Sequence, residues 1–200
     1  NAGGGKSGAL NYALQFTDGQ WLLILDADAQ LKKDTLRRLF SFVEEGSWSA
    51  VQLRKSVINV NKNFLTSCQS MEMAMDAIFQ YGRLSVAGVS ELRGNGQLIK
   101  KEVLLKCGLF NEDTVTDDLD LSLRLLLNKS RIGILWDPPV MEEAVENVNA
   151  LFSQRQRWAE GGLQRFFDYG DQLFSKKINF LQRFDLIYFF ILQYALAIIS

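Results

Sequence analysis

Short apolar runs alternate with helical patterns along most of this chain, and no other feature restricts its fold as much. The predicted strands are 21–25, 49–54 and 97–99, and the predicted helices around them are 6–17, 34–45 and 65–84. The stretch "TVTDDLDLSLRLLL" opens a further helix, and "RIGILWDPP" is a strand that its two prolines should end. Strands separated by helices predict an α/β domain with a mostly parallel sheet.

Composition removes several classes of function. The 200 residues carry a formal net charge of −1, which gives no electrostatic case for a nucleic-acid partner. The chain has no histidine, so imidazole is not available as a base, a nucleophile or a metal ligand. Its two cysteines are too few for a disulfide framework or a zinc site and are expected to be small core residues. Acid–base chemistry therefore falls to carboxylates, lysines, tyrosines or cysteines.

The last quarter of the chain changes character. In "FSKKINFLQRF" a helix would place Phe174, Ile178 and Leu181 on one face and the basic residues elsewhere, which suits a membrane interface. The stretch after Asp185 carries no charge, which is typical of the start of a transmembrane helix, although a buried terminal helix is the alternative. The predicted division is a catalytic domain over 1–170, an amphipathic interface helix over 171–184 and the start of a transmembrane helix over 185–200.

The stretch "WLLILDADAQ" is an apolar strand that ends in two carboxylates. Its carboxyl end is where an open α/β sheet binds ligands, and Asp26 and Asp28 lie on the same side of an extended backbone. Two like charges held close favour a cation between them, and carboxylate oxygens suit Mg²⁺ or Mn²⁺ bound to a diphosphate. The structural alternative is that both residues cap the helix that follows Leu31.

A second acidic stretch, "TVTDDLDLSLRLLL", opens the next predicted helix. Thr116 or Asp117 can cap this helix, and Asp120 can complete a capping box, so capping explains much of the acidity. Asp118 is not fully assigned by capping. A carboxylate at this position, facing the same crevice as Asp26, can accept a proton from an acceptor hydroxyl.

Two further segments carry weaker signals. In "FSQRQRWAEGG", Gln154, Arg157 and Trp158 share one helix face, where the indole offers a surface for a sugar ring and the guanidinium a fork for a phosphate. An amphipathic helix with an interfacial Trp has the same pattern. In "ELRGNGQ", Gly94 and Gly96 let a ligand approach the backbone, as would an ordinary turn before a strand.

The opening "NAGGGKSG" resembles the end of a phosphate-binding P-loop, with the apolar run into Asp26 as its magnesium strand. A P-loop also needs a glycine six residues before Lys6 and a strand leading into the loop. Only about twenty residues separate Lys6 from Asp26, which is short for that arrangement. A nucleotide-hydrolysing domain therefore remains an alternative, and its only support is this incomplete P-loop motif.

Taken together, three motifs in one order resemble the membrane-bound family 2 glycosyltransferases, the relatives of cellulose and hyaluronan synthases. The motifs are DAD at 26–28, TDD at 116–118 and QRQRW at 154–158, where the family carries DxD, TED and QxxRW on a GT-A fold. Lys6 and the Ala-Leu-Asn at 9–11 also match the helix that precedes DxD in this family. The resemblance covers essentially the whole chain, and its one departure is Asp117 in place of Glu.

The resemblance implies roles for individual residues. Asp118 is the general base, and Asp26 and Asp28 hold the nucleotide diphosphate and its Mg²⁺ or Mn²⁺. The remaining donor- and acceptor-binding positions are Lys6, Asn11, Gly94, Asn95, Gly96, Asp117, Gln154, Arg157 and Trp158. The family's uracil-binding Asp lies upstream of DxD, so the chain is expected to be a piece that lacks the first strands of its fold.

The reaction implied is transfer of a hexose, expected to be glucose, from a UDP-sugar by a single displacement with inversion. The stretches "ELRGNGQ" and "RWAEGGLQRFFDY" resemble cyanobacterial-type enzymes that glucosylate diacylglycerol, which favours a lipid acceptor. A processive polysaccharide synthase is the main alternative, and a non-catalytic membrane scaffold is another. The implied location is an integral membrane protein whose catalytic domain faces the cytoplasm.

Overall fold

A four-stranded mixed sheet forms the centre of the protein, for which a computed structural model describes residues 4–195. The strand order is β1-β3-β2-β4, with bounds Trp21–Ile24 (β1), Gln97–Lys100 (β3), Ala50–Val57 (β2) and Ile132–Glu142 (β4). Strands β1, β2 and β4 run in one direction, but only β2 and β4 pair as parallel neighbours. The predicted α/β class is confirmed, whereas "mostly parallel" is wrong for the pairing. The chain enters β3 from the edge where β1 and β2 end, so β3 runs back between them.

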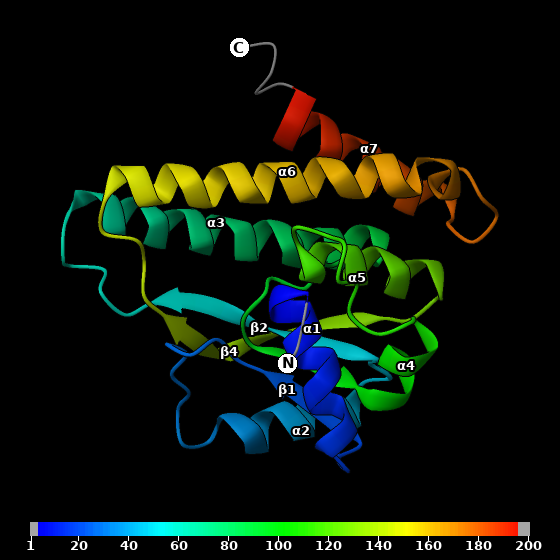
Figure 1. Ribbon diagram of the computed structural model, residues 1–200, viewed down its shortest axis with the longest axis horizontal. Helices are drawn as coiled ribbons and strands as arrows, with labels where there is room; N and C mark the ends of the chain where they lie inside the picture. Colours follow the sequence, from blue (N-terminus) through cyan, green and yellow to red (C-terminus); the bar gives the residue numbers. More distant parts are fainter. Residues whose placement is uncertain (1–3, 196–200) are drawn as a thin grey trace.

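Helices cover both faces of this sheet (Figure 1). The helices are α1 (Gly5–Ala13), α2 (Thr35–Glu45), α3 (Phe64–Ala87), α4 (Lys101–Lys106), α5 (Asp117–Leu127), α6 (Val148–Leu173) and α7 (Phe180–Phe190), with short helical turns at Leu14–Phe16 and Ile191–Ala195. Helix α2 lies on one side of the sheet, whereas α3 and α5 lie on the other, with α6 stacked beyond α3. The helices predicted over 6–17, 34–45 and 65–84 are confirmed.

Strand β4 continues through its two prolines, so the prediction that they end it is wrong. The parallel register with β2 shifts between Leu53 and Lys55: Leu53 faces Leu135, and Lys55 faces Val140. The residues between Leu135 and Val140, which include both prolines, form an irregular bulge. Because proline has no N–H to donate, it is tolerated where the ladder is interrupted.

The predicted interface helix over 171–184 is wrong as a single helix. Helix α6 ends at Leu173, and α7 begins at Phe180 after a turn in which Asn179 caps the new helix. Ile178 is buried, so this turn is fixed to the body of the protein. Between residues 4 and 195 no helix has the length and hydropathy needed to cross a bilayer, and the predicted transmembrane start over 185–200 extends beyond the described residues.

Three apolar clusters hold these layers together. One lies between the sheet and α4 and α5, a second between the sheet and α2, and a third where the ends of α3, α5, α6 and α7 meet. Leu121 and Leu125 of α5 are fully buried, as are Leu39 of α2 and Ile99 of β3. Cys107 is buried in the first cluster, as predicted, and Cys68 is partly buried. Because both faces of the sheet are packed against helices, the backbone is held in place at the edge where β1 and β2 end.

Candidate active site

Asp26 and Asp28 follow β1 at this edge of the sheet. The Asp26 carboxylate accepts a hydrogen bond from Lys6 Nζ at 2.6 Å, and Asp28 accepts one from the backbone N–H of Glu143 at 3.3 Å. The N-cap of α2 is Asp34, so the alternative that Asp26 and Asp28 cap this helix is wrong. Both carboxylates remain accessible to a ligand.

Lys6 lies in the first turn of α1 and reaches across to the other elements of the site. Its Nζ also donates to the carbonyl oxygen of Gly94 at 3.1 Å. Burial lowers the pKa of Lys6, but the bond to Asp26 and the charges of Asp26, Asp117 and Asp118 outweigh burial and raise it. The ammonium therefore stays charged among three carboxylates.

The N-terminus of α5 presents Asp117 and Asp118. Thr116 occupies the N-cap position without a side-chain capping bond, and Asp120 is buried and bonded to Arg124 at 2.7 Å, so the predicted capping box does not form. Burial and the neighbouring charge of Asp117 raise the pKa of Asp118 to about 6, although Arg93 and Lys55 oppose the shift. A carboxyl group with this pKa exchanges a proton near neutral pH, as a general base requires.

In the loop before β3, Gly94 is partly buried and the next two residues, Asn95 and Gly96, are buried. At Gly94, which has a φ of 81°, an added Cβ would lie 3.5 Å from Asp118 Oδ2, so the bare backbone borders the carboxylate. Asn95 is fully buried; it accepts from Asp26 N–H at 3.1 Å and donates to Glu142 at 2.9 Å. An added Cβ at Gly96 would lie 2.6 Å from Val140. The Asn95 side chain thus positions the backbone of Asp26, and substrate contact by Gly94, Asn95 and Gly96 stays a prediction.

Lys55 and Glu142 belong to the site although the sequence did not indicate them. Lys55 Nζ and Glu142 Oε1 are 2.6 Å apart, and their side chains are 17% and 11% exposed. Lys55 also lies 6.0 Å from the ring centroid of Trp158. The available signal was a lysine near the carboxyl end of β2, the end of a strand where α/β sheets bind ligands.

The QRQRW segment lies on α6, above this edge. Trp158 is 38% exposed and stacks on Arg155, whose guanidinium carbon is 4.3 Å from the ring centroid. An added Cβ at Gly161 would lie 2.3 Å from the Thr116 hydroxyl, so this glycine lets α6 approach the start of α5 closely. Gln154 is partly buried and Arg157 is exposed, and their contact with substrate stays a prediction.

Asn11 lies behind the site, on α1. Its amide donates to the Phe110 carbonyl at 2.9 Å, and its oxygen accepts from the Phe110 N–H at 3.0 Å. It also donates to Glu112 at 2.9 Å. These bonds hold the helix that carries Lys6, and nucleotide contact by Asn11 stays a prediction.

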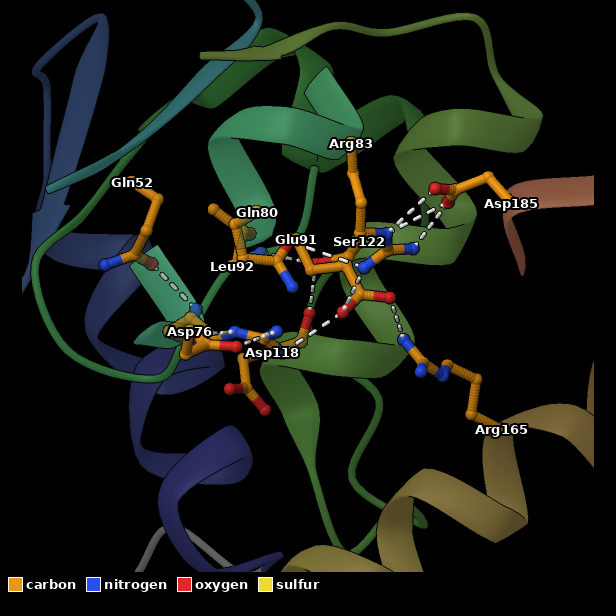
Figure 2. A network of polar contacts seen from close by, with 11 residues as sticks. Gln52, Asp76, Gln80, Arg83, Glu91, Leu92, Asp118, Ser122, Arg165 and Asp185 are labelled. Carbon is orange, nitrogen blue, oxygen red and sulfur yellow. Dashed lines mark hydrogen bonds and ion pairs between the residues drawn. The ribbon is translucent and has the colours of Figure 1, made fainter. Parts of the chain in front are cut away.

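A cluster of buried charges is centred on Glu91, in the loop between α3 and β3 (Figure 2). Glu91, which is 3% exposed, pairs with Arg165 at 2.7 Å, Arg93 at 3.1 Å and Arg83 at 3.3 Å. Arg83 also binds Asp185 of α7 at 2.8 Å. Burial opposes ionisation of Glu91, but the three arginines hold its pKa well below the usual range. We call Glu91, these three arginines and Asp185 the Glu91 cluster; it joins α3, α6 and α7 to the loop beside Asp118.

The residues present fit a divalent cation that is bound together with a substrate. Among residues 4–195 no three acidic or cysteine side chains converge on one point, so the chain offers no complete cage of its own. Mg²⁺ and Mn²⁺ commonly use one or two carboxylates and take their other ligands from phosphates and water. Asp26 and Asp28 supply such a pair, and Lys6 balances the Asp26 charge.

The sequence profile of glycosyl transferase family group 2 matches residues 21–200, so the chain belongs to this glycosyltransferase family. Among similar proteins, the beta-monoglucosyldiacylglycerol synthase of Synechocystis sp. is 46% identical over 98% of this chain and 41% of its own length. The protein of the same name from Trichormus variabilis is 44% identical over 98% of this chain and 42% of its own length. The chain thus spans about two fifths of these relatives.

Solved structures share the same architecture. The Pyrobaculum calidifontis mannosyltransferase PcManGT, in complex with GDP-Man and Mn²⁺, superposes with a TM-score of 0.68 at 21% identity, covering 94% of this chain and 49% of that one. Staphylococcus aureus TarS with UDP-GlcNAc gives 0.56 at 14% identity, over 92% and 51%. The fold is therefore the predicted GT-A fold. The P-loop alternative is wrong, because Lys6 pairs with a carboxylate of a family 2 domain.

Proposed function

We propose that this chain is the catalytic part of an inverting glucosyltransferase that uses UDP-glucose, a divalent cation and a diacylglycerol acceptor. One observation carries the proposal: Asp118, with a pKa raised to about 6, lies beside Lys6 and the Asp26 carboxylate at an open edge of the sheet. A base with this pKa is ionised at neutral pH and still accepts a proton effectively. The names of the relatives at 46% and 44% identity support the sugar and the acceptor.

Asp118 takes the proton of the acceptor hydroxyl as its oxygen attacks the anomeric carbon of the donor. The bare Gly94 backbone leaves room for that hydroxyl next to the carboxylate. Attack opposite the leaving diphosphate inverts the anomeric centre, so an α-linked UDP-glucose gives a β-glucoside. The relatives' name specifies a β-linked product, which agrees with inversion.

The donor end of the site is positively charged at Lys6 and acidic at Asp26 and Asp28. Lys6 would bind a diphosphate oxygen once the donor is present, while the two carboxylates hold the cation. When bound, Mg²⁺ or Mn²⁺ stabilises negative charge on the departing diphosphate. Trp158 offers an exposed ring face for a sugar, flanked on α6 by Gln154 and Arg157.

A diacylglycerol acceptor requires the site to work at a bilayer. Phe180, Phe184 and Tyr188 follow one another along α7 at helical spacing and are 80%, 59% and 49% exposed. Such an aromatic face suits the membrane interface, and the stretch over 186–200, which carries no charge, suits the start of a transmembrane helix. We therefore place the protein in a membrane, with this domain on the cytoplasmic side, where UDP-sugars are made.

The test uses the intact protein, purified in a neutral detergent, with UDP-glucose, diacylglycerol and Mg²⁺ or Mn²⁺. A β-glucosyldiacylglycerol identified by mass spectrometry and by the NMR coupling of its anomeric proton supports the proposal, and EDTA should abolish its formation. Replacing UDP-glucose with GDP-mannose tests the donor. Failure to bind any sugar nucleotide would favour the non-catalytic scaffold.

A polysaccharide synthase is the second candidate, favoured by one observation. Glucomannan 4-beta-mannosyltransferase 1 of Oryza sativa subsp. japonica is 27% identical over 98% of this chain and 39% of its own length. An insoluble polymer in the same assay, with no glycolipid in the organic extract, would establish this function instead.

A further inference from the structure

A basic hollow lies at the far end of α5 from Asp118, where the turn between α6 and α7 packs against the ends of α3 and α5. Its volume is about 340 Å³, and four of its lining residues are Lys129, Arg131, Lys176 and Lys177. No carboxylate lines it, and within residues 4–195 none of these four cations forms an ion pair. Lys129 follows Asp118 by eleven residues, about 16 Å at the helical rise, so this is not the donor site.

The turn that carries two of the lysines is held rigidly. Ile178 is 3% exposed in the cluster with Leu186, and Arg183 donates to the carbonyls of Leu173 at 2.8 Å and Ser175 at 3.2 Å. Lys176 and Lys177 are therefore presented by an ordered segment and need little ordering when they bind an anion.

Lys129 adopts a backbone conformation that a lysine rarely takes. Its φ is 57°, in the left-handed region where glycine or asparagine usually ends a helix. The backbone N–H groups at this turn are hydrogen-bonded to the end of α5: Lys129 N–H donates to the Leu126 carbonyl and Ser130 N–H to the Leu125 carbonyl, both at 2.9 Å. A lysine in this conformation costs more energy than a glycine would, so its presence indicates a use for its side chain.

Arg131 and α7 complete the site. The guanidinium carbon of Arg131 lies 4.4 Å from the Trp48 ring centroid. This stacking occupies the flat face of the guanidinium, so the N–H donors at its edge are left for an oxyanion. Asn179 and Gln182 also line the hollow; their side chains form the capping box of α7, so this helix end contributes its dipole, which favours negative charge. The C-terminal ends of α3 and α5, which carry partial negative charge, oppose anion binding only weakly, because the N–H groups of Gly88 and Ser130 already bond their carbonyls.

We propose that this hollow binds the phosphate of an anionic membrane phospholipid. The lipid source is argued from the apolar side chains beside it: Phe174 and Phe180 are 67% and 80% exposed and flank Lys176 and Lys177 in the chain. Basic residues next to exposed aromatic side chains are typical of segments that lie on anionic bilayers. The hollow thus recognises a headgroup while the aromatic side chains enter the acyl region. This site does not depend on the reaction proposed above, because lipid binding is measured without donor or acceptor.

The test is a titration of the intact protein in neutral detergent with short-chain phosphatidylglycerol and, separately, phosphatidylcholine, with bound lipid counted by native mass spectrometry. Phosphatidylglycerol should bind more tightly, and salt should weaken it. Each cation near an anionic surface contributes about a fivefold change in affinity, so Lys176→Gln with Lys177→Gln should weaken binding about 25-fold. The matched control, Lys32→Gln with Lys33→Gln, changes a lysine pair before α2 and should bind like wild type.

Lys129→Gly separates a binding role from a structural one. Glycine relieves the backbone at φ 57°, so the variant should be at least as stable as wild type and yet bind phosphatidylglycerol about fivefold more weakly. Equal binding of both lipids, equal loss in the Lys32/Lys33 control, or unchanged binding by Lys129→Gly would overturn the proposal. Binding of glycerol 3-phosphate as tightly as phosphatidylglycerol would assign the hollow to a soluble phosphate ester and overturn the lipid assignment.

Discussion

Asp118 borders the loop between α3 and β3, Glu91 lies within that loop, and the pKa values of these two carboxyl groups shift in opposite directions. Asp118 has Asp117 as its neighbour, with Arg93 and Lys55 only partly opposing it, and its pKa rises to about 6. Glu91 is more deeply buried, but its three arginines hold its pKa far below the ordinary value. Loss of water raises the pKa of both groups, so the neighbouring charges decide the outcome. One carboxylate is left able to accept a proton, and the other is a permanent anion whose ion pairs join α3 and α6 to its own loop.

The largest expected effect comes from removing the carboxylate that can accept a proton. Asp118→Asn should lower kcat by about 10³-fold, because general-base catalysis contributes on this scale, while donor affinity changes little. UDP release and UDP-glucose binding would be measured on the same preparation. Retention of most of the activity would remove Asp118 from the role of base.

Removing the permanent anion should act on stability first. Glu91→Gln leaves the buried Arg165 with no acidic partner among residues 4–195, whereas Arg93 keeps Asp76 and Arg83 keeps Asp185. The change should cost about 3–5 kcal/mol of folding free energy. For a protein of this size the apparent melting temperature should fall on the order of 10 °C. Glu44→Gln, at an exposed carboxylate of α2, is the matched control and should melt like wild type. An unchanged melting temperature for Glu91→Gln would contradict the importance of the Glu91 cluster.

The outer end of the same cluster should be less sensitive. Asp185 is 14% exposed, and without it Arg83 keeps Glu91 as a partner. Asp185→Asn should therefore cost about 1–3 kcal/mol, the range for a lost hydrogen bond to a charged group. Thermal melts of Asp185→Asn and Glu91→Gln side by side check the order, and a larger loss for Asp185→Asn would reverse it.

The smallest effect is a shift in the pH profile. The base must be ionised, so kcat/KM should be constant well above pH 6 and fall about tenfold per pH unit below it. Asp117 raises the pKa of Asp118, so Asp117→Asn should lower that pKa and move the acidic limb to lower pH. Asp113→Asn, at an exposed position in the segment before α5, should leave the limb in place. A shift of the limb to higher pH in Asp117→Asn would contradict this account.

Much of the fold was predictable because its signals are local. The strand ending in Asp26 and the helix opening at Asp117 follow from apolar spacing and residue type over a few neighbours. The prolines of β4 and the turn before Phe180 were mispredicted for the opposite reason: a bulge and a buried Ile178 depend on partners that lie elsewhere in the chain. The antiparallel direction of β3 likewise depends on the edge from which the chain re-enters the sheet, and no local signal specifies that edge.

The candidate site divides in the same way. Motif spacing identified Asp26, Asp28 and Asp118, because acidic residues at the ends of apolar strands and the starts of helices have a chemical use that can be read locally. It did not identify Lys55, and it did not indicate that Asn95 is fully buried and donates to Glu142. Burial depends on which residues cover a side chain, and those residues belong to other elements.

The sequence by itself determined the order of strands and helices, the family and the residue types available for the reaction. Only the tertiary structure decided that the pKa of Asp118 is raised, whereas Glu91 stays ionised among buried arginines. Lys6 meets Asp26 across 20 residues and the Gly94 carbonyl across 88, and Glu91 meets Arg165 across 74. Electrostatic energy depends on distance in space and on excluded water, neither of which follows from separation along the chain.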